Sequence, residues 1–267
     1  MKKLVLIDGH NLMFQMYYGM PNKILNSKNI DIRGVIGFIG GLNKIINMLN
    51  PDNILVSFDG EEPPNKTTLD KNYKANRPAL DVNDNPFVGY QYIKTCLDNM
   101  HIKHFENTLI ETDDLIAKYV NTYKDTYKIY VVSSDKDFYS LVSDNVEVFT
   151  YRGKNSKFIT PQYILEKYNI KPHNFGLFKC LVGDTSDNIA GIKGIGPKTA
   201  SNLINKYSTL DNMLCLDIIK NNYQLLLHNR QLVDFDCNIK LPFDITDLGF
   251  INTNLTTTQI LKISNVY

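Results

Sequence analysis

Short apolar runs alternate with longer helical patterns through the first 150 residues of this chain. The strand-like runs are Leu4–Ile7, Ile54–Phe58, Ile129–Val132 and Val146–Thr150. Between them, apolar residues recur at helical spacing in Val35–Leu49, Tyr90–Met100 and Leu115–Tyr123. Strands that alternate with helices are typical of parallel βαβ units. The pattern therefore predicts an α/β fold with a mostly parallel central sheet flanked by helices.

The pattern changes at about Thr160, where strand-like runs become rare. Helical patterns follow in Pro161–Tyr168, Asn174–Val182, Pro197–Tyr207 and Tyr223–Val233. We therefore predict two domains, an α/β core over residues 1–172 and a C-terminal helical region over residues 173–267.

Residues 60–89 form a long polar connection between two apolar patterns. Its basic residues include Lys66, Lys71, Lys74 and Arg77, with Tyr73 among them. A polar connection of this length is either solvated and disordered or functional. In the functional interpretation it is a mobile cover whose Lys and Arg side chains contact phosphates while a base stacks on Tyr73.

Acidic residues follow the apolar runs at positions where a parallel sheet would gather them at one edge. They are Asp8, Asp59, Glu111, Asp113, Asp114, Asp135, Asp137, Asp184 and Asp187. Taken singly, each fits a turn, an N-cap or the first turn of a helix. Taken together, they favour one shared site. So many carboxylates are unfavourable without cations, and oxygen ligands suit Mg²⁺ or Mn²⁺.

The segment GIKGIGPKTA (191–200) superficially resembles a phosphate-binding P-loop, but Pro197 interrupts that motif and no strand precedes it. A helix–hairpin–helix over about 184–207 is the better interpretation, because two glycines form a tight turn and Pro197 begins the next helix. Backbone N–H groups at such a helix start can hold a DNA phosphate. The candidate DNA-binding residues are Lys193, Gly194, Gly196, Lys198 and Thr199.

The charge balance is compatible with binding a polyanion, and the cysteine spacing argues against zinc and disulfide proteins. The net charge is +1, but without these nine acids the chain has 29 basic and 28 − 9 = 19 acidic residues, a balance of +10. Such a surface can hold a polyanion. The four cysteines are widely spaced, which argues against a zinc site or a disulfide framework and predicts buried free thiols. The N-terminal MKKLVLIDGH is typical of a strand and not of a signal peptide, so we expect an intracellular protein.

Three stretches are similar to signatures of the 5′-nuclease family, which comprises flap endonucleases and the 5′→3′ exonuclease domain of bacterial DNA polymerase I. They are VSSDKDFYSLV, VGDTSDNIAGIKGIGPKTA and YKANRP. The resemblance runs from Lys3 to about Val233 and implies a PIN-like nuclease core with residues 60–89 as its arch or clamp. It assigns Asp8, Asp59, Glu111 and Asp113 to a first metal ion. It assigns Asp114, Asp137, Asp184 and Asp187 to a second, with Asp135 near both. Tyr73, Lys74 and Arg77 match the catalytic signature at the base of the arch.

The resemblance also implies an activity and its partners. It implies a structure-specific 5′ nuclease that hydrolyses DNA phosphodiesters as a flap endonuclease and 5′→3′ exonuclease in replication or repair, such as removal of RNA primers and flaps. Two Mg²⁺ ions, replaceable by Mn²⁺, and a K⁺ near Gly194 and Gly196 are expected. The expected partners are branched or 5′-flap DNA and duplex DNA with a 5′ single strand, bound by a monomer without a membrane. We expect a stand-alone protein in the cytoplasm of a bacterial or phage-infected cell. Two alternatives stay open, a catalytically silent branched-DNA-binding protein and a PIN-type ribonuclease.

Overall fold

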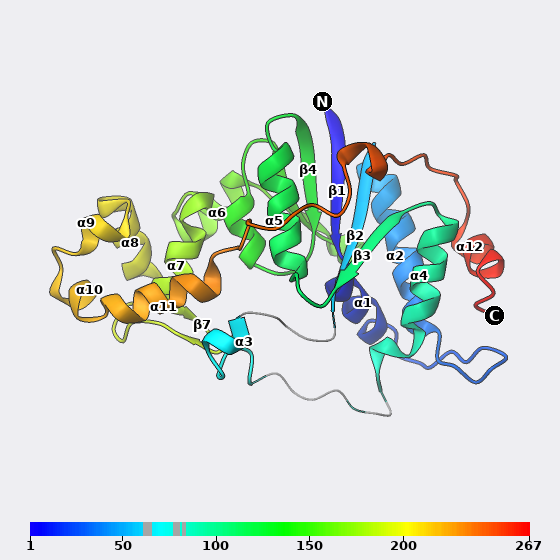
Figure 1. The fold of residues 1–267 in the computed structure, drawn as a ribbon, viewed down its shortest axis with the longest axis horizontal. Helices are drawn as coiled ribbons and strands as arrows, with labels where there is room; N and C mark the ends of the chain where they lie inside the picture. Colours follow the sequence, from blue (N-terminus) through cyan, green and yellow to red (C-terminus); the bar gives the residue numbers. More distant parts are fainter. Residues whose placement is uncertain (61–65, 77–80, 82–83) are drawn as a thin grey trace.

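A six-stranded sheet forms the centre of the protein in a computed structural model that describes residues 1–60, 66–76, 81 and 84–267 (Figure 1). The strand order is β3-β2-β1-β4-β5-β6. The strands are β1 (Lys2–Asp8), β2 (Asn53–Asp59), β3 (Lys103–Asn107), β4 (Tyr127–Val132), β5 (Val146–Thr150) and β6 (Lys157–Ile159). All pairings are parallel except that of β5 with β6, which is antiparallel. The predicted α/β fold with a mostly parallel sheet is confirmed.

Two strands of this sheet were not predicted from the sequence pattern, and both lie at an edge of the sheet. β3 has the sequence KHFEN and β6 the sequence KFI. Central parallel strands are covered on both faces and therefore carry continuous apolar runs. An edge strand is less enclosed, and neither of these two carries such a run.

Helices cover both faces of the sheet and divide its apolar residues into two cores. In β1, Val5 and Ile7 belong to one core, while Leu4 and Leu6 belong to the other. This division follows from the alternation of side chains along a strand. The helices of the first core are α1 (Gly9–Tyr18), α2 (Arg33–Leu49), α4 (Tyr90–Asn99) and α12 (Thr257–Ile263), and α5 (Thr112–Tyr123) covers the opposite face.

The segment that follows β6, residues 161–233, is mainly helical and extends away from the sheet, toward the left of Figure 1, before the chain returns to α12 on the right. Its helices are α6 (Pro161–Tyr168), α7 (Phe175–Val182), α8 (Pro197–Tyr207), α9 (Leu210–Met213), α10 (Asp217–Asn221) and α11 (Tyr223–Val233). A two-stranded hairpin, β7 (Gly183–Asp184) and β8 (Ile189–Ala190), lies between α7 and α8. Short elements complete the fold: α3 (Lys66–Leu69), η1 (Pro86–Gly89), η2 (Asp137–Leu141), η3 (Gly153–Asn155), η4 (Pro172–Asn174) and η5 (Ile245–Leu248).

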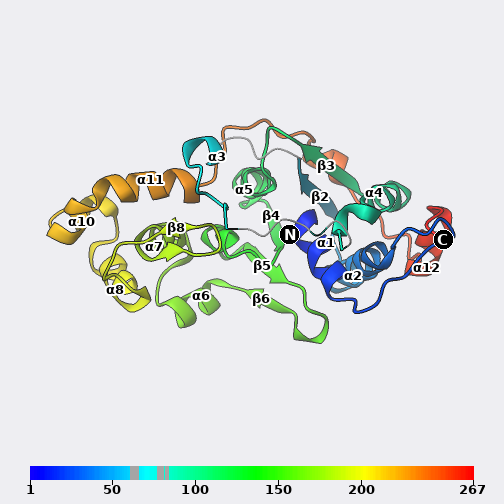
Figure 2. The same cartoon turned by 90° about the horizontal axis from the view of Figure 1, so that it is seen from below.

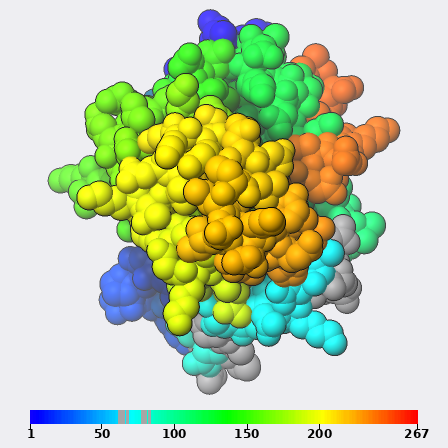
Figure 3. Space-filling model, turned by 90° about the vertical axis from the view of Figure 1, so that its left-hand side faces the viewer, coloured from blue at the N-terminus to red at the C-terminus, as the bar shows by residue number. Residues whose placement is uncertain are grey.

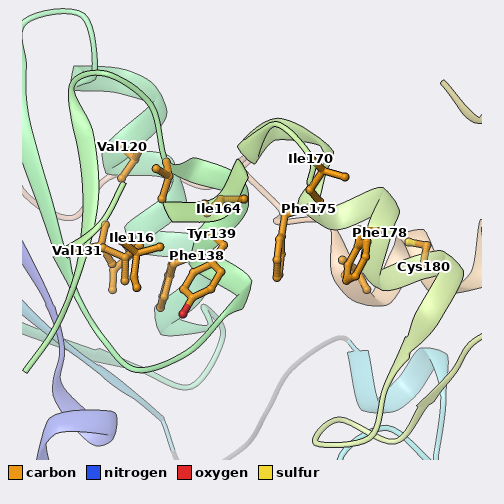
Figure 4. Packing of buried hydrophobic residues seen from close by; sticks show 14 of the residues in the cluster. Ile116, Val120, Val131, Phe138, Tyr139, Ile164, Ile170, Phe175, Phe178 and Cys180 are labelled. Atoms are coloured by element: carbon orange, nitrogen blue, oxygen red, sulfur yellow. The ribbon is translucent and has the colours of Figure 1, made fainter. Parts of the chain in front are cut away.

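The helical region packs directly on the sheet through the second core. Figure 4 shows Phe138 and Tyr139 of η2 lying between Val131 of the sheet and Phe175 and Phe178 of α7. Tyr139 and Phe175 are in ring contact, with centroids 5.1 Å apart. The helical region is therefore joined to the sheet by a continuous apolar core. The domain boundary at residues 172–173 stays a prediction.

Two smaller expectations can be compared with the structure. In the described part of the chain, the apolar helices are all too short to cross a lipid bilayer. All four cysteines are free thiols, as expected. Cys96 and Cys180 are buried, but Cys215 is exposed and Cys237 is half-buried, so the expectation of burial was wrong for these two.

Candidate metal-binding and nucleic-acid site

Four predicted carboxylates line one open cavity at the C-terminal end of the sheet. The cavity has a volume of about 480 Å³, and its acidic lining residues are Asp8, Asp59, Asp113 and Asp135. Asp8 and Asp59 end the neighbouring strands β1 and β2. Asp113 lies in the first turn of α5, and Asp135 follows β4. The sheet thus brings together residues that are up to 127 positions apart in the sequence (135 − 8).

Local hydrogen bonds hold these carboxylates in place. Asp8 accepts a hydrogen bond from the backbone N–H of Asn11 at 3.0 Å and so caps α1. The hydroxyl of Ser133 donates to the second oxygen of Asp8 at 2.9 Å and accepts from the N–H of Asp135 at 3.0 Å. Gly9 is required beside them, because a Cβ there would lie 2.4 Å from the ring of Phe58. Asp8 is therefore both a helix cap and a lining residue of the cavity.

Two of the carboxylates in this cavity have a raised pKa. Burial, followed by the charges of Asp59 and Asp135, raises the pKa of Asp8 to about 7, against hydrogen bonds that lower it. Burial and the charge of Asp135 raise the pKa of Asp113 well above its usual range, and Lys74 only partly opposes this. The cavity therefore holds four carboxylates against two basic side chains, Lys74 and Arg152. Such a set of oxygen donors fits a hard divalent cation.

A second group of carboxylates lies at the hairpin that follows α7. Oxygens of Asp137, Asp184 and Asp187 all lie within 4.8 Å of one another, a spacing that could hold a metal ion. In the structure they surround the ammonium group of Lys179, which contacts Asp137 and lies 2.7 Å from Asp184 and 4.0 Å from Asp187. Burial lowers the pKa of Lys179, but the charge of Asp137 and hydrogen bonds to Asp137 and Asp184 outweigh it and raise the pKa overall. Lys179 is therefore the counterion of this group.

The remaining two predicted carboxylates line a different cavity. Glu111 and Asp114 lie 3.3 and 3.9 Å from the ammonium group of Lys66, beside a cavity of about 440 Å³. Residues three apart on a helix share a face, whereas Asp113 points toward the Asp8 cavity. The nine acids therefore form three groups. The structure places Glu111 apart from the other acids assigned to the first metal ion, and Asp114 apart from the other acids assigned to the second.

The segment before Arg77 puts a lysine at the Asp8 cavity. Lys74 lines this cavity, and its ammonium group lies 4.8 Å from the ring centroid of Tyr73. Tyr73 is only 5% exposed and belongs to the second core. A base cannot stack on so enclosed a ring, so that part of the interpretation of residues 60–89 was wrong. Arg77 lies outside the described residues, as do 61–65, 78–80 and 82–83.

The GIKGIGPKTA segment forms an exposed turn that leads into α8. Gly194 has a φ of +91°, and a Cβ added at Gly194 or Gly196 would meet no described atom within 4 Å. Ile192 and Ile195 are buried in the second core and anchor the turn there. The candidate DNA-binding residues all lie on its exposed side: Lys193, Gly194, Gly196, Lys198 and Thr199. The backbone of this turn is open to a ligand.

Sequence reasoning missed Lys179 and His10 at these sites, and it expected Lys66 to contact phosphates and not carboxylates. Lys66 and Lys179 neutralise carboxylates, and His10 lies 3.7 Å from Asp59 against a cluster of aromatic rings. Within the described structure, the buried Nε2 of His10 has no hydrogen-bond partner. Lys179 had a signal in the sequence, because it is the single charge in the apolar helix FGLFKCLV.

Comparison with known proteins identifies the family. Residues 3–169 match the model of the 5′-3′ exonuclease N-terminal resolvase-like domain, and residues 170–255 match the 5′-3′ exonuclease C-terminal SAM fold. The chain belongs to the 5′-3′ exonuclease family. The resemblance inferred from the motifs is therefore confirmed.

Relatives and solved structures agree with this assignment. A 5′-3′ exonuclease of Aquifex aeolicus is 30% identical over 93% of this chain and 83% of its own length. DNA polymerase I of Borreliella burgdorferi is 33% identical over 91% of this chain, which matches only 28% of that polymerase. In fold, the chain is similar to a bacteriophage T5 flap endonuclease solved with DNA and metal ions, with a TM-score of 0.72 at 22% identity over 99% of this chain and 100% of that one. The catalytic core of Rad2 in complex with a DNA substrate gives a TM-score of 0.60 at 14% identity over 100% and 89%.

Proposed function

We propose that this protein is a metal-dependent 5′ nuclease that hydrolyses DNA phosphodiesters as a 5′→3′ exonuclease and flap endonuclease. The observation that carries the proposal is the cavity in which Asp8, Asp59, Asp113 and Asp135 face Lys74. Membership of the 5′-3′ exonuclease family and the activity named for the Aquifex relative support it. Removal of RNA primers or flaps in replication or repair is the process that this activity would serve.

The two separate groups of carboxylates support two Mg²⁺ ions, with Mn²⁺ as a substitute. Asp8, Asp59, Asp113 and Asp135 would hold one ion, and Asp137, Asp184 and Asp187 the other. When bound, such ions lower the pKa of a water and neutralise charge on the departing oxygen. The bacteriophage T5 flap endonuclease of similar fold was solved with metal ions, which supports a dependence on metal. Glu111 and Asp114 would then act from the neighbouring cavity through their contact with Lys66.

Lys74 is the residue we assign to the scissile phosphate. It is a cation in a cavity with four carboxylates, so it can bind a phosphate oxygen and stabilise charge that develops there. Tyr73 fixes its backbone from the core. Arg77, three residues further on, keeps its predicted role of bidentate phosphate contact.

The turn at Gly194 and Gly196 would bind duplex DNA through its phosphates. Its backbone N–H groups, its exposed lysines Lys193 and Lys198, and Thr199 at the start of α8 suit a contact that is independent of base sequence. A K⁺ ion near Gly194 and Gly196 would assist this contact. The expected substrates are branched or 5′-flap DNA and duplex DNA with a 5′ single strand, bound by a monomer in the cytoplasm of a bacterial or phage-infected cell.

Cleavage of a 5′-flap DNA and of an RNA hairpin, compared side by side in Mg²⁺ and in EDTA, tests the proposal. We expect cleavage of the flap only, and only with Mg²⁺. Flap binding without cleavage would favour the catalytically silent DNA-binding protein. Cleavage of the RNA hairpin alone would favour a PIN-type ribonuclease, which would normally lack the helix–hairpin–helix segment.

A further inference from the structure

Three hydrogen bonds join residues 72–76 to residues 185–188, and we call this pair of segments the clasp. The backbone N–H of Lys74 donates to the carbonyl of Asp187 at 3.0 Å. The side-chain amide of Asn76 donates to the carbonyl of Thr185 at 2.7 Å. The amide of Asn188 donates in the opposite direction, to the carbonyl of Asn72 at 2.8 Å. The two segments are more than a hundred residues apart in sequence, so these bonds are tertiary contacts.

The clasp connects the two groups of carboxylates. Residues 185–188 are the turn of the β7–β8 hairpin, which carries Asp184 and Asp187 of the second group. The other segment carries Lys74, which lines the Asp8 cavity. Asp187 takes part in both, because its carboxylate belongs to the second group and its carbonyl accepts from Lys74. The hairpin turn is therefore bonded directly to the backbone of Lys74.

The backbone at the clasp depends on these contacts. Lys74 has a φ of +57° and Asn188 a φ of +59°. Asparagine enters this left-handed region readily, whereas for lysine it is unfavourable. Neighbouring contacts must therefore hold Lys74 there, and the clasp supplies one of them at its own N–H group. A 2.9 Å contact between Asp70 and His228 of α11 fixes the same segment further upstream. Figures 2 and 3 place this cyan segment beside α11.

We propose that Asn76 and Asn188 are positioning residues, which clasp the Lys74 segment to the hairpin turn so that a divalent ion at Asp137, Asp184 and Asp187 fixes Lys74 at the Asp8 cavity. The inference rests on the proposed function in assigning Lys74 to the phosphate. The coupling itself is a property of the folded chain and can be measured without substrate.

Hydrogen–deuterium exchange with and without Mn²⁺ tests the coupling. In the wild type, Mn²⁺ should slow exchange in residues 183–191 and also in residues 70–76. In the double variant Asn76→Ala/Asn188→Gly, Mn²⁺ should still slow exchange in 183–191 but not in 70–76. Glycine is chosen at Asn188 because it keeps the left-handed backbone while removing the amide. If the double variant does not fold, the same exchange measurement is made on the single variant Asn76→Ala.

Asn145→Ala is the matched control. Its exposed amide also donates to a distant carbonyl, that of Lys124 at 3.1 Å, but at the turn between β4 and β5. In this variant, Mn²⁺ should slow exchange in residues 183–191 and 70–76 as it does in the wild type. The proposal is overturned if Mn²⁺ protects residues 70–76 equally in the double variant, or fails to protect them in the wild type.

Kinetics on a 5′-flap DNA give a second readout. The double variant should lose roughly tenfold in kcat with little change in KM, because a misplaced catalytic group affects mainly the transition state. The triple variant that also carries Lys74→Ala should have the same kcat as Lys74→Ala alone. If the reductions in kcat instead multiply, Asn76 and Asn188 do not act through Lys74. If the wild type cleaves no flap, the proposed function fails, and the exchange experiment still decides the coupling.

Discussion

Carboxylates that line the Asp8 cavity also hold the local backbone in place. Asp8 caps α1 and also lines the cavity, and Asp135 accepts a hydrogen bond from the N–H of Asp137 at 2.9 Å. The ordinary explanation for an acid at the start of a helix or turn is therefore correct for both residues. It does not compete with the metal-site explanation, because a carboxylate has two oxygens and several lone pairs.

Asp135→Asn should separate cleavage from DNA binding. The substitution keeps the size of the side chain and removes a charge from the Asp8 cavity, so Mg²⁺-dependent cleavage of a 5′-flap DNA should fall by at least about 100-fold. Binding of the flap in Ca²⁺ or EDTA should survive, because the helix–hairpin–helix turn is unchanged. Asp125→Asn, an exposed acid in the turn before β4, is the control. Full activity of Asp135→Asn would remove the metal hypothesis for this cavity.

Lys179→Met should make the protein depend on a divalent ion for its stability. The substitution leaves three neighbouring carboxylates without their buried counterion, which should lower the free energy of unfolding in EDTA by about 3 kcal/mol. Mn²⁺ should restore more stability to this variant than it adds to the wild type, because an ion no longer competes with the ammonium group. Thermal unfolding with and without Mn²⁺ measures both effects.

Lys128→Met provides the comparison for Lys179. Lys128 pairs with Glu147 at 2.6 Å but is partly exposed, so its loss should cost about 1 kcal/mol or less and show no dependence on Mn²⁺. Equal stabilisation of the wild type and Lys179→Met by Mn²⁺ would contradict the role of Lys179 as a counterion.

At the scale of elements, the sequence predicts the features that arise from periodicity within a single segment. The apolar runs at β1, β2, β4 and β5 identified the strands, and parallel pairing then placed Asp8 and Asp59 side by side. The resemblance assigns Glu111 and Asp113 to one metal ion, whereas in the structure their side chains line different cavities.

Tertiary contacts between polar side chains could not be predicted from the sequence. The pairing of Lys66 with Glu111, and the clasp bonds of Asn76 and Asn188, join segments whose spacing in the chain carries no periodic signal. The burial of Tyr73 has the same origin, because a tyrosine in a polar connection gives no sign that the core behind it will accept its ring. These are the parts of the site that only the folded chain reveals.

The exposed turn before α8 leads to a prediction about DNA affinity. Lys193→Ala and Lys198→Ala should each weaken binding of duplex DNA uniformly across sequences and lower the salt dependence, with a slope of log K against log[salt] smaller by about 1 per lysine. Lys118→Ala, on the solvent side of α5, should leave the slope unchanged. Fluorescence anisotropy from low to high salt gives the slopes. An unchanged slope in Lys193→Ala and Lys198→Ala would exclude this turn as a phosphate contact.

At the scale of the whole molecule, two apolar cores hold a strongly acidic edge between them. The first core fixes α1 behind Asp8, and the second joins the sheet to α7, whose Lys179 balances the hairpin. The fold therefore keeps mutually repelling carboxylates in place through apolar packing elsewhere. Because that repulsion depends on protonation, the stability of the metal-free protein should depend on pH.

The pKa of Asp8 fixes the direction of this dependence. Burial and neighbouring charges raise it from 3.8 to about 7 in the folded protein. The protonated carboxyl is therefore favoured by folding, and its contribution to stability is complete below pH 3.8 and is lost as the pH rises toward 7. Asp8→Asn keeps a side chain that can cap α1 but removes this titration.

In EDTA, the free energy of unfolding of Asp8→Asn should therefore rise relative to that of the wild type as the pH increases from about 4 to about 7. With saturating Mn²⁺ the wild type should instead gain stability over the same range, because the ions bind the deprotonated carboxylates. Urea unfolding at several pH values, with and without Mn²⁺, measures both trends. A constant difference between Asp8→Asn and the wild type in EDTA would mean that Asp8 is ionised in the metal-free protein. The repulsion at the acidic edge would then be relieved by a basic side chain of the cavity, with Lys74 and Arg152 as the candidates.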